Sequence, residues 1–181
     1  MLPYHAARME RTLKECLGIR AGWRLEEILP LPGDIDPVQK CRILYGKDVF
    51  KTEWQPYQRT IHKGHLLVHD DTLDYRYKYA DRQSIEKHVL KAPEYHDVII
   101  VRDGMITDAS YSNLVFYDGE HWVTPAKPLL PGVMRAYLLD SGTISERDMH
   151  IDDLRAYPVF KKINALNPLE SAPVYFVKDM S

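Results

Sequence analysis

The chain has 181 residues, 45% of them hydrophobic, and a formal net charge of -2. This length and composition allow a sizeable core and exclude a disordered or collagen-like chain, so we expect one compact unit. The balanced charge, with a pI of about 6.4, gives no electrostatic reason to expect nucleic acid or an anionic membrane as a partner, and it favours a small molecule.

The two cysteines, Cys16 and Cys41, are too few for a disulfide framework or a zinc site. Cys16 falls in a helical pattern and Cys41 in a strand pattern, so we expect two buried thiols and no bound metal. No apolar run approaches the roughly 20 residues of a membrane span, and the N-terminus lacks the charged and apolar regions of a signal peptide. A cytoplasmic location is therefore expected.

The first part of the chain predicts a helix followed by a β-hairpin. Residues 4–18 carry apolar side chains at near-helical spacing and end at a glycine that suits a helix C-cap. The Pro- and Gly-rich residues 20–37 predict a connector with one short helix. Residues 40–57 alternate apolar and polar side chains around a Gly-Lys-Asp turn, which predicts an antiparallel hairpin, and residues 64–70 predict a third strand. The three strands could form one small sheet.

The remainder predicts further helices and hairpins. Residues 82–90 have a helical period, residues 97–125 predict strands turned at two Asp-Gly pairs, and residues 132–142 predict a helix closed by Gly142. Mixed strands and short helices are expected to follow. The sequence shows no internal repeat, low-complexity tract or linker.

These elements predict a mixed α+β fold of two small lobes, each of largely antiparallel sheet with helices. Because no linker marks a boundary, the division must fall in an ordered segment. We place it next to Lys78, between a smaller N-terminal lobe of residues 1–78 and a C-terminal lobe of residues 79–181.

Lys78 lies in the aromatic stretch "YRYKYA", which predicts a strand with Lys78 on the face opposite Tyr77 and Tyr79. A lysine at such a position is most often exposed to solvent. A partly desolvated lysine has a lowered pKa and can form a Schiff base with a carbonyl group. Residue type and strand pattern alone leave both interpretations open.

Three other features are ambiguous when each is taken alone. Residues 107–113 are rich in Asp, Ser and Asn just before an apolar strand, which an ordinary turn would explain. Pro131-Gly132 precedes a helix start, where free N–H groups and the helix dipole can hold a phosphate. Arg8 lies on the first helix, where an exposed arginine usually only increases solubility.

Five segments nevertheless follow one another in a recognisable order: "HAAR", "KYADR", "TDASYSNLVF", "LPGVMR" and "INALNPLESAPV". Between His5 and about Val174 they resemble the conserved segments of the class IV, or fold type IV, family of pyridoxal phosphate (PLP) enzymes. That family includes branched-chain and D-amino acid aminotransferases and aminodeoxychorismate lyase. The resemblance implies PLP as the cofactor, bound between the two lobes.

The resemblance also implies roles for individual residues. Lys78 would be the Schiff-base lysine, Arg8 would grip the cofactor phosphate, and Asp108, where a glutamate is usual, would face the pyridine nitrogen. Backbone N–H groups of the "LPGVMR" segment would complete the phosphate cup. The implied cofactor-binding residues are Arg8, Lys78, Asp108, Ser112, Asn113, Gly132, Val133, Met134, Asn164 and Ala165.

The first chemical steps implied are common to the family: a substrate amine displaces Lys78, which then takes a proton from the carbon bearing that amine. A lyase of the aminodeoxychorismate type would release pyruvate and leave 4-aminobenzoate, as in folate biosynthesis, whereas an aminotransferase would release a keto acid. "KYADR" and "INALNPL" favour the lyase. Substrate carboxylates need cationic or N–H partners, for which the candidates are Arg76, Arg82, His5 and Lys161. We predict Arg76, two residues from Lys78 on the expected strand, and Arg82.

One departure from the family pattern concerns the N-terminus. Members usually carry a strand hairpin before the "HxxR" helix, whereas here Met1 lies four residues before His5. This opens a further alternative, a non-catalytic member of the fold. By resemblance we also expect a homodimer, because sites in this family lie near a subunit interface.

Overall fold

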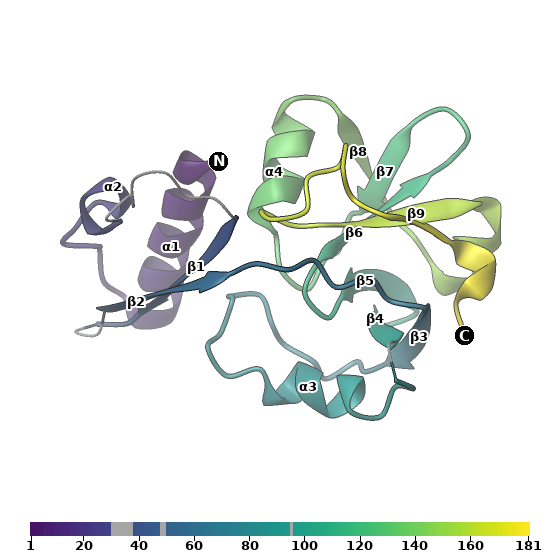
Figure 1. Ribbon diagram of the computed structural model, residues 1–181, viewed down its shortest axis with the longest axis horizontal. Coiled ribbons are helices and arrows are strands. Elements are labelled where there is room, and N and C mark those ends of the chain that lie inside the picture. The colour runs from purple at the N-terminus through teal and green to yellow at the C-terminus, as the bar shows by residue number, and fades with distance from the viewer. Residues whose placement is uncertain (30–37, 48–49, 95) are drawn as a thin grey trace. The chain divides into compact units, whose positions relative to one another are not determined.

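A computed structural model of the chain describes residues 1–29, 38–47, 50–94 and 96–181 (Figure 1). They form two compact units, Met1–Arg59 and Thr60–Ser181. This division precedes the lobe boundary expected next to Lys78, because the strand of residues 64–69 pairs inside the second unit. The mixed α+β fold class is confirmed, and within the described ranges no helix is long and apolar enough to cross a membrane.

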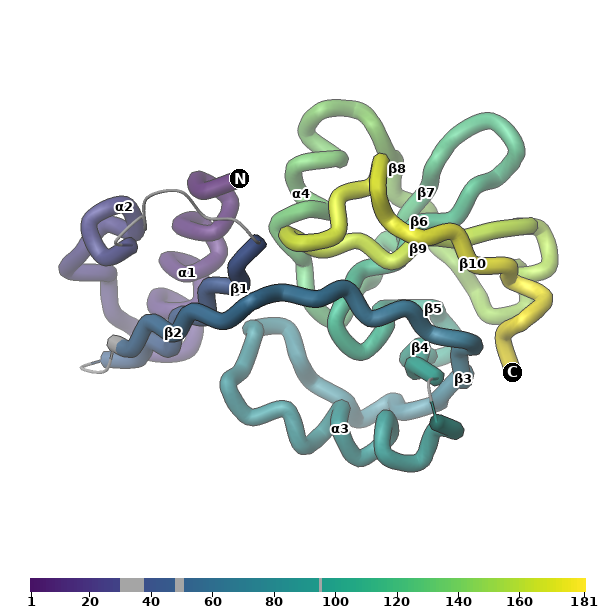
Figure 2. The backbone as a smooth tube through the Cα atoms, viewed as in Figure 1, coloured from purple at the N-terminus to yellow at the C-terminus, as the bar shows by residue number. Residues whose placement is uncertain are grey.

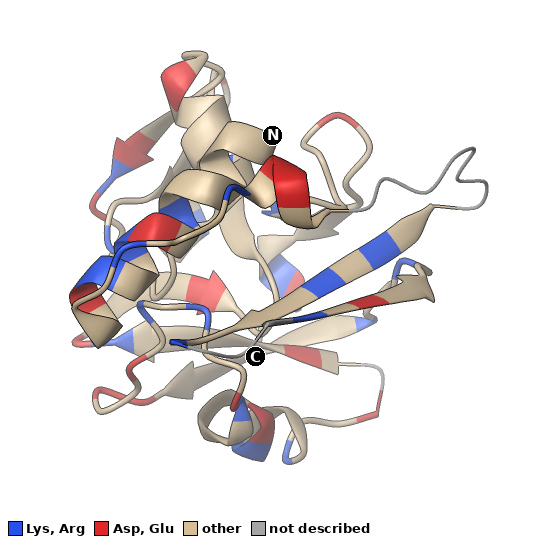
Figure 3. Ribbon diagram, turned by 90° about the vertical axis from the view of Figure 1, so that its left-hand side faces the viewer, with Lys and Arg blue, Asp and Glu red and all other residues tan. Residues whose placement is uncertain are grey.

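The first unit contains the predicted helix and hairpin. Helix α1 (Leu2–Leu17) buries Met9 and Leu13 and ends at Gly18, whose φ of 65° places it in the left-handed region that glycine adopts without strain. The short helix α2 (Leu25–Ile28) follows. Strands β1 (Gln39–Tyr45) and β2 (Phe50–Pro56) pair antiparallel, which confirms the hairpin, and they carry charges of both signs (Figure 3). Part of the predicted connector and of the turn lies outside the described residues.

The second unit is built on a sheet in the order β10-β9-β6-β5-β4-β3, with β7 and β8 extending it from β6. Most neighbouring strands are antiparallel, as expected, whereas the β3–β4 and β7–β8 pairs are parallel. Its elements are β3 (Gly64–His69), α3 (Gln83–Val89), β4 (His96–Arg102), β5 (Met105–Ala109), β6 (Asn113–Tyr117), β7 (Trp122–Pro125), α4 (Val133–Asp140), β8 (Ile144–Arg147), the 3-10 helix η1 (Ile151–Ala156), β9 (Val159–Ile163), β10 (Val174–Phe176) and the 3-10 helix η2 (Val177–Asp179).

The prediction that β3 joins the hairpin strands in one small sheet is wrong. β3 instead pairs parallel with β4, and the backbone trace shows the crossover through α3 that brings the chain back beside it (Figure 2). A parallel pair needs such a long connection, which local sequence does not reveal. The other side of β3 is bonded to the last residue of the chain, because Ser181 N–H donates to His65 O and Leu67 N–H donates to Ser181 O.

The turn at Asp103-Gly104 is confirmed. Both residues have positive φ, 51° and 74°, as the tight two-residue hairpin between β4 and β5 requires. β4 is buried on both faces. On one face Ile99 and Val101 pack with Phe116 and Phe160. On the other face its remaining apolar residues pack with side chains that lie before α3 and within it: Val98 and Ile100 with Leu73, Tyr75 and Ile85. The site described below therefore rests on the most deeply buried strand of the unit.

Two further predictions are wrong. Residues 75–80 form an irregular loop and not a strand, because Tyr75 turns inward and its hydroxyl donates to Tyr79 O at 3.0 Å. The cysteines are not buried: Cys16 is exposed in the last turn of α1, and Cys41 is half-buried.

His65 gives the second unit a predictable response to acid. Its ring is 2% exposed and lies edge-on to Phe160 and Tyr175. Burial, with a smaller contribution from Lys162, lowers the pKa of His65 from 6.5 to about 3, against the opposing charge of Asp97. The unfolded chain therefore binds the proton first, and stability is lost as the pH falls from 6.5 towards 3.

We expect the free energy of unfolding contributed by His65 to fall by about 1.4 kcal/mol per pH unit in that window. Urea unfolding at pH 7 and pH 5 should show a smaller pH dependence in His65→Phe than in the wild-type chain. His69→Gln, an exposed histidine on the same strand, is the matched control. Equal pH dependence in wild type and His65→Phe would contradict the assignment.

Candidate functional site

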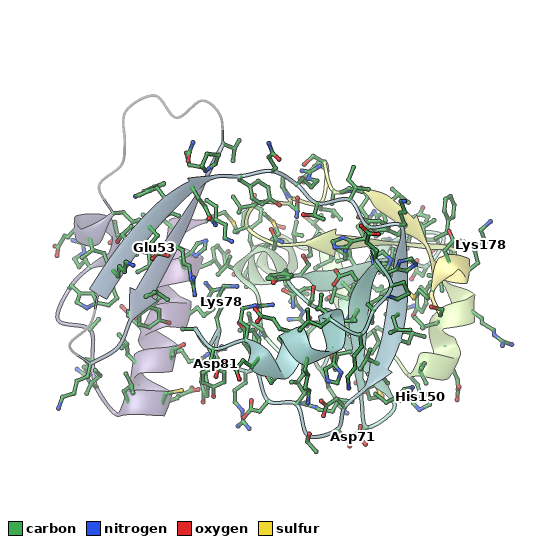
Figure 4. All side chains as sticks on the ribbon, turned by 60° about the horizontal axis from the view of Figure 1, so that its bottom comes forward. Glu53, Asp71, Lys78, Asp81, His150 and Lys178 are labelled. Atoms are coloured by element: carbon green, nitrogen blue, oxygen red, sulfur yellow. The ribbon has the colours of Figure 1, made fainter. Side chains whose placement is uncertain are left out.

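Lys78 is exposed on the irregular loop that joins β3 to α3 (Figure 4). The loop is held at its end by Asp81, whose carboxylate accepts the N–H of Gln83 at 2.9 Å where α3 begins. The Tyr75 hydroxyl closes the loop from within. Lys78 therefore projects from a segment that has an irregular backbone but is fixed by hydrogen bonds on both sides.

Arg82 connects this loop to the loop between β5 and β6. One guanidinium nitrogen donates to the Tyr75 hydroxyl at 2.9 Å and the other to Ser110 O at 2.7 Å. The guanidinium also lies 4.0 Å from the centre of the Tyr111 ring. These contacts make Arg82 a link between the two loops, and its predicted contact with substrate stays a prediction.

Arg76 is exposed and pairs with Asp74, with one contact of 3.0 Å to each carboxylate oxygen. In a strand, Arg76 and Lys78 would lie on the same face, but this segment is a loop, so strand alternation does not place them together. That Arg76 holds a substrate carboxylate stays a prediction, now for a residue on a loop and not on a strand.

Asp108 lies at the end of β5 and is 5% exposed. Each carboxylate oxygen accepts a hydrogen bond: Oδ1 from Asn113 Nδ2 at 2.7 Å and Oδ2 from the Leu130 N–H at 2.9 Å. Burial raises the pKa of Asp108 to about 6, although these hydrogen bonds and Arg135 oppose the shift. The group is an oriented, buried carboxyl whose pKa lies well above its usual range.

Asn113 joins Asp108 to the start of α4. Its Nδ2 also donates to Leu130 O at 2.8 Å, and its Oδ1 lies against Gly132, the residue before the helix. The N-cap residue, Gly132, has no side chain that could cap this helix start. As at any helix start, the first N–H groups, those of Val133 and Met134, have no partner within the helix. Such a helix start can bind an anion.

Asn164, directly after β9, contacts the loop between β5 and β6. Its Nδ2 donates to Ser112 Oγ at 2.9 Å and lies 3.4 Å from Tyr111 O. Ala165 is exposed beside it. The structure thus brings together, within one compact unit, most of the cofactor-binding residues expected from the sequence: Asp108, Ser112, Asn113, Gly132, Val133, Met134, Asn164 and Ala165.

This donor set fits PLP. A buried carboxylate suits a protonated ring nitrogen, an uncapped helix start suits a phosphate, and a lysine on an adjoining loop suits an aldehyde. Gly132 also leaves space where a larger residue would push Asn113 away. Arg8 is half-buried on α1 in the other compact unit, so its contact with the cofactor phosphate stays a prediction.

Sequence reasoning missed three buried charged residues. Arg135, the last residue of "LPGVMR", is 5% exposed and donates to Glu146 at 2.6 Å and to Pro125 O at 2.9 Å. Asp97 and Lys162 form an ion pair inside the unit. A signal was available, because strand alternation puts Lys162 on the same face of β9 as the buried Phe160. Its partner Asp97, however, lies far away in the sequence.

The close approach of Gly132 to Asn113 predicts a large effect for Gly132→Ala. The added methyl would overlap Asn113 Oδ1 and come within 3.2 Å of its Cγ, and moving Asn113 breaks its bonds to Asp108 and Leu130. We expect a loss of about 2–4 kcal/mol in unfolding free energy, from overpacking and lost hydrogen bonds. Urea unfolding should show it, with Gly22→Ala, which has open space around it, as the control. A loss no larger than that of the control would contradict the contact.

Comparison with known proteins places this group in context. Residues 75–165 match the profile of the family described as amino-transferase class IV. A protein of Haemophilus influenzae that is named only as uncharacterized is 34% identical over 168 residues, which are 91% of this chain and 89% of that protein.

Two crystal structures are similar over nearly their whole length. A candidate 4-amino-4-deoxychorismate lyase from Haemophilus somnus has 31% sequence identity and a TM-score of 0.87, covering 93% of this chain and 90% of that one. A candidate amino-acid aminotransferase from Mesorhizobium loti has 25% identity and a TM-score of 0.76, covering 92% and 87%.

Proposed function

The chain belongs to the class IV aminotransferase family of PLP-dependent enzymes, and from this premise we propose that it acts as a 4-amino-4-deoxychorismate lyase. The products would be 4-aminobenzoate and pyruvate. The observation that carries the proposal is the hydrogen-bonded set from Asp108 through Asn113 to the start of α4, in the same unit as Lys78. The similarity to the Haemophilus somnus structure supports the lyase over other members.

PLP, when bound, supplies an electron sink for a carbanion at the carbon bearing the substrate amine. The chain's own residues supply the rest. Lys78 would hold the cofactor aldehyde and, once released, carry a proton on Nζ. Asp108 would hold a proton on the ring nitrogen through its carboxylate, and the N–H groups of Val133 and Met134 would bind the phosphate.

The remaining residues would orient the ligands. Ser112 and Asn164, bonded to each other, would form one wall of the site, and Ala165 would lie beside them. Arg8 would contribute a bidentate contact to the phosphate. Arg76, which is exposed and paired with Asp74, would contact a substrate carboxylate. Arg82 would act by holding the Lys78 loop as well as by its charge.

An aminotransferase acting on branched-chain or D-amino acids is the second candidate, favoured by the similarity to the Mesorhizobium loti structure. The two activities share the early proton transfer and differ in the need for an acceptor. A lyase needs no keto acid, whereas an aminotransferase stops after one turnover without one.

The test uses the purified chain with PLP and two assays. With 4-amino-4-deoxychorismate alone, a lyase produces 4-aminobenzoate and pyruvate in equal amounts over many turnovers. With a panel of branched-chain and D-amino acids, product that forms only when 2-oxoglutarate or pyruvate is added identifies an aminotransferase. A chain that holds PLP but turns over neither substrate class would refute both and favour the non-catalytic alternative.

We further propose that the enzyme is a homodimer and that it works in the cytoplasm, in folate biosynthesis. The dimer is inferred from the family, whose sites lie near subunit interfaces. Light scattering coupled to size exclusion measures the mass in solution, and a mass near 21.1 kDa would contradict the dimer.

A further inference from the structure

Asp97 and Lys162 form a buried ion pair next to the candidate site. Lys162 Nζ donates to Asp97 Oδ2 at 2.7 Å, and the two residues are 7% and 3% exposed. Lys162 Nζ also lies 2.8 Å from His62 Nδ1, which accepts the hydrogen bond when the lysine is charged. Both charges are therefore removed from water, which is costly unless their hydrogen bonds are satisfied.

The pair spans the loop between β5 and β6. Asp97 precedes the point where β4 pairs with the end of β5, at Ile99 and Ala109. Lys162 precedes the point where β9 pairs with the start of β6, at Ile163 and Asn113. The Asp97 and Lys162 side chains thus connect the two outer strands, β4 and β9, across the turn that joins the two inner strands, β5 and β6.

Asp97 uses its second oxygen to hold that turn. Oδ1 accepts the Ser110 hydroxyl and the Val98 N–H. Burial acts to raise the pKa of Asp97, but Lys162 and Ser110 outweigh it and hold the pKa below its usual range. The carboxylate is therefore charged, and its acceptor sites are directed at the lysine and the loop serine.

Ser110 is fixed at its hydroxyl and at its carbonyl. Its hydroxyl bonds to Asp97, and its carbonyl accepts Arg82 Nη2 at 2.7 Å. The loop that contains it connects Asp108 to Asn113, whose side chains are themselves bonded at 2.7 Å. A shift of Ser110 would therefore move both residues that we assign to the cofactor.

Stability does not account for a charged pair at this place. An apolar pair of similar volume is often as stable or more stable than a buried ion pair. What an apolar pair cannot supply is a directed acceptor for the Ser110 hydroxyl. The charged pair therefore serves to hold the β5–β6 loop in one geometry, through the hydrogen bond from Ser110 to Asp97.

We propose that Asp97 and Lys162 are positioning residues that, through Ser110, fix the β5–β6 loop in the conformation that presents Asp108 and Asn113 to the cofactor. The proposal rests on the proposed function for its effect on PLP. Its effect on the loop concerns the chain alone and can be measured without cofactor.

The experiment compares Ser110→Ala, which removes only the link, with the double variant Asp97→Leu/Lys162→Met, which removes both charges of the pair and the acceptor for the Ser110 hydroxyl. Hydrogen exchange of the amides of residues 109–113 is measured without PLP, at denaturant concentrations that equalise global stability. PLP dissociation constants are measured in parallel. Ser141→Ala removes a serine hydroxyl at the far end of α4, bonded at 3.1 Å, and Lys87→Met removes a lysine paired with Asp70 at 3.0 Å, so both are controls.

We expect loop exchange to accelerate and PLP binding to weaken by about tenfold in Ser110→Ala, the effect of one lost buried hydrogen bond, and at least as much in the double variant. Both controls should match the wild-type chain. Wild-type loop exchange and PLP affinity in both test variants would overturn the proposal. If the wild-type chain does not bind PLP, the proposed function fails, and loop exchange still decides the positioning role.

Discussion

Lys78→Ala is expected to abolish covalent retention of PLP and to lower turnover by about 10³-fold or more, because in the proposed function the Lys78 amine both holds the cofactor and moves the proton. In the wild-type chain, borohydride should fix PLP to the protein and remove its visible absorption band. Peptide mass spectrometry after reduction should then find the label on the segment that contains Lys78. The exposed position of Lys78 on its loop makes it accessible to the aldehyde.

Lys87→Ala is the control for this experiment, because Lys87 is on α3 in the same unit and pairs with Asp70. It should bind PLP and turn over substrate as the wild-type chain does. A Lys78→Ala chain that still acquires a borohydride-fixed label at another lysine would show that the motif was carried over to the wrong residue.

Asp108→Asn is expected to reduce turnover by about 10²–10³-fold, the usual effect of removing one oriented electrostatic group from an active site, while PLP stays attached through Lys78. Asparagine offers one acceptor where the carboxylate offers two, and its amide would face either Leu130 N–H or Asn113 Nδ2. We therefore also expect a loss of about 1–3 kcal/mol in unfolding free energy. Turnover equal to that of the wild-type chain would exclude Asp108 from the chemistry.

Asp108→Glu separates charge from side-chain length. Glutamate is the residue usual at this position in the family pattern and keeps the negative charge. If charge is what matters, Asp108→Glu should retain more activity than Asp108→Asn, even if its longer side chain disturbs the buried site. Activity equal in the two variants would mean that position, and not charge, is decisive.

The raised pKa of Asp108 predicts how the stabilisation of the chain by PLP changes with pH. Its pKa is about 6 in the folded chain against 3.8 for an ordinary aspartate, so the folded state holds the proton more tightly. Ionisation therefore costs stability as the pH rises through this window, by about 1.4 kcal/mol per pH unit. The protonated ring nitrogen of PLP would be a cation beside this carboxylate and would offset that cost. PLP should therefore raise the melting temperature of the wild-type chain more at pH 7.5 than at pH 5. Asp108→Asn should lack this difference.

Local signals account for the elements that the sequence predicted correctly. Gly18 and Gly142 end helices in the left-handed conformation, and Asp103-Gly104 forms the tight turn, because these conformations depend on the residue itself. The pairing of β3 with β4 depends on a crossover, and the loop at residues 75–80 depends on where Tyr75 is buried. Alternating aromatic residues are equally compatible with a strand, so the sequence could not distinguish the two.

The candidate site shows the same contrast. The order of the motifs was enough to group Asp108, Asn113 and Gly132, which the structure joins by direct contacts. Nothing local in the sequence links Asp97 to Lys162, and only the sheet order brings them across the same loop. The charge of Arg82 makes it a candidate partner for a substrate carboxylate, whereas its contacts with Tyr75 and Ser110 depend on tertiary packing.

The backbone bonds between Ser181 and β3 bear on how copies of this protein interact. A strand at the border of a sheet normally offers its N–H and C=O groups to any other extended chain, which leads to edge-to-edge association. Here β4 occupies one side of β3, and Ser181 bonds to His65 and Leu67 on the other. The His65 C=O and the Leu67 N–H are already satisfied, so a neighbouring molecule that adds a strand at this point of the border must first displace Ser181.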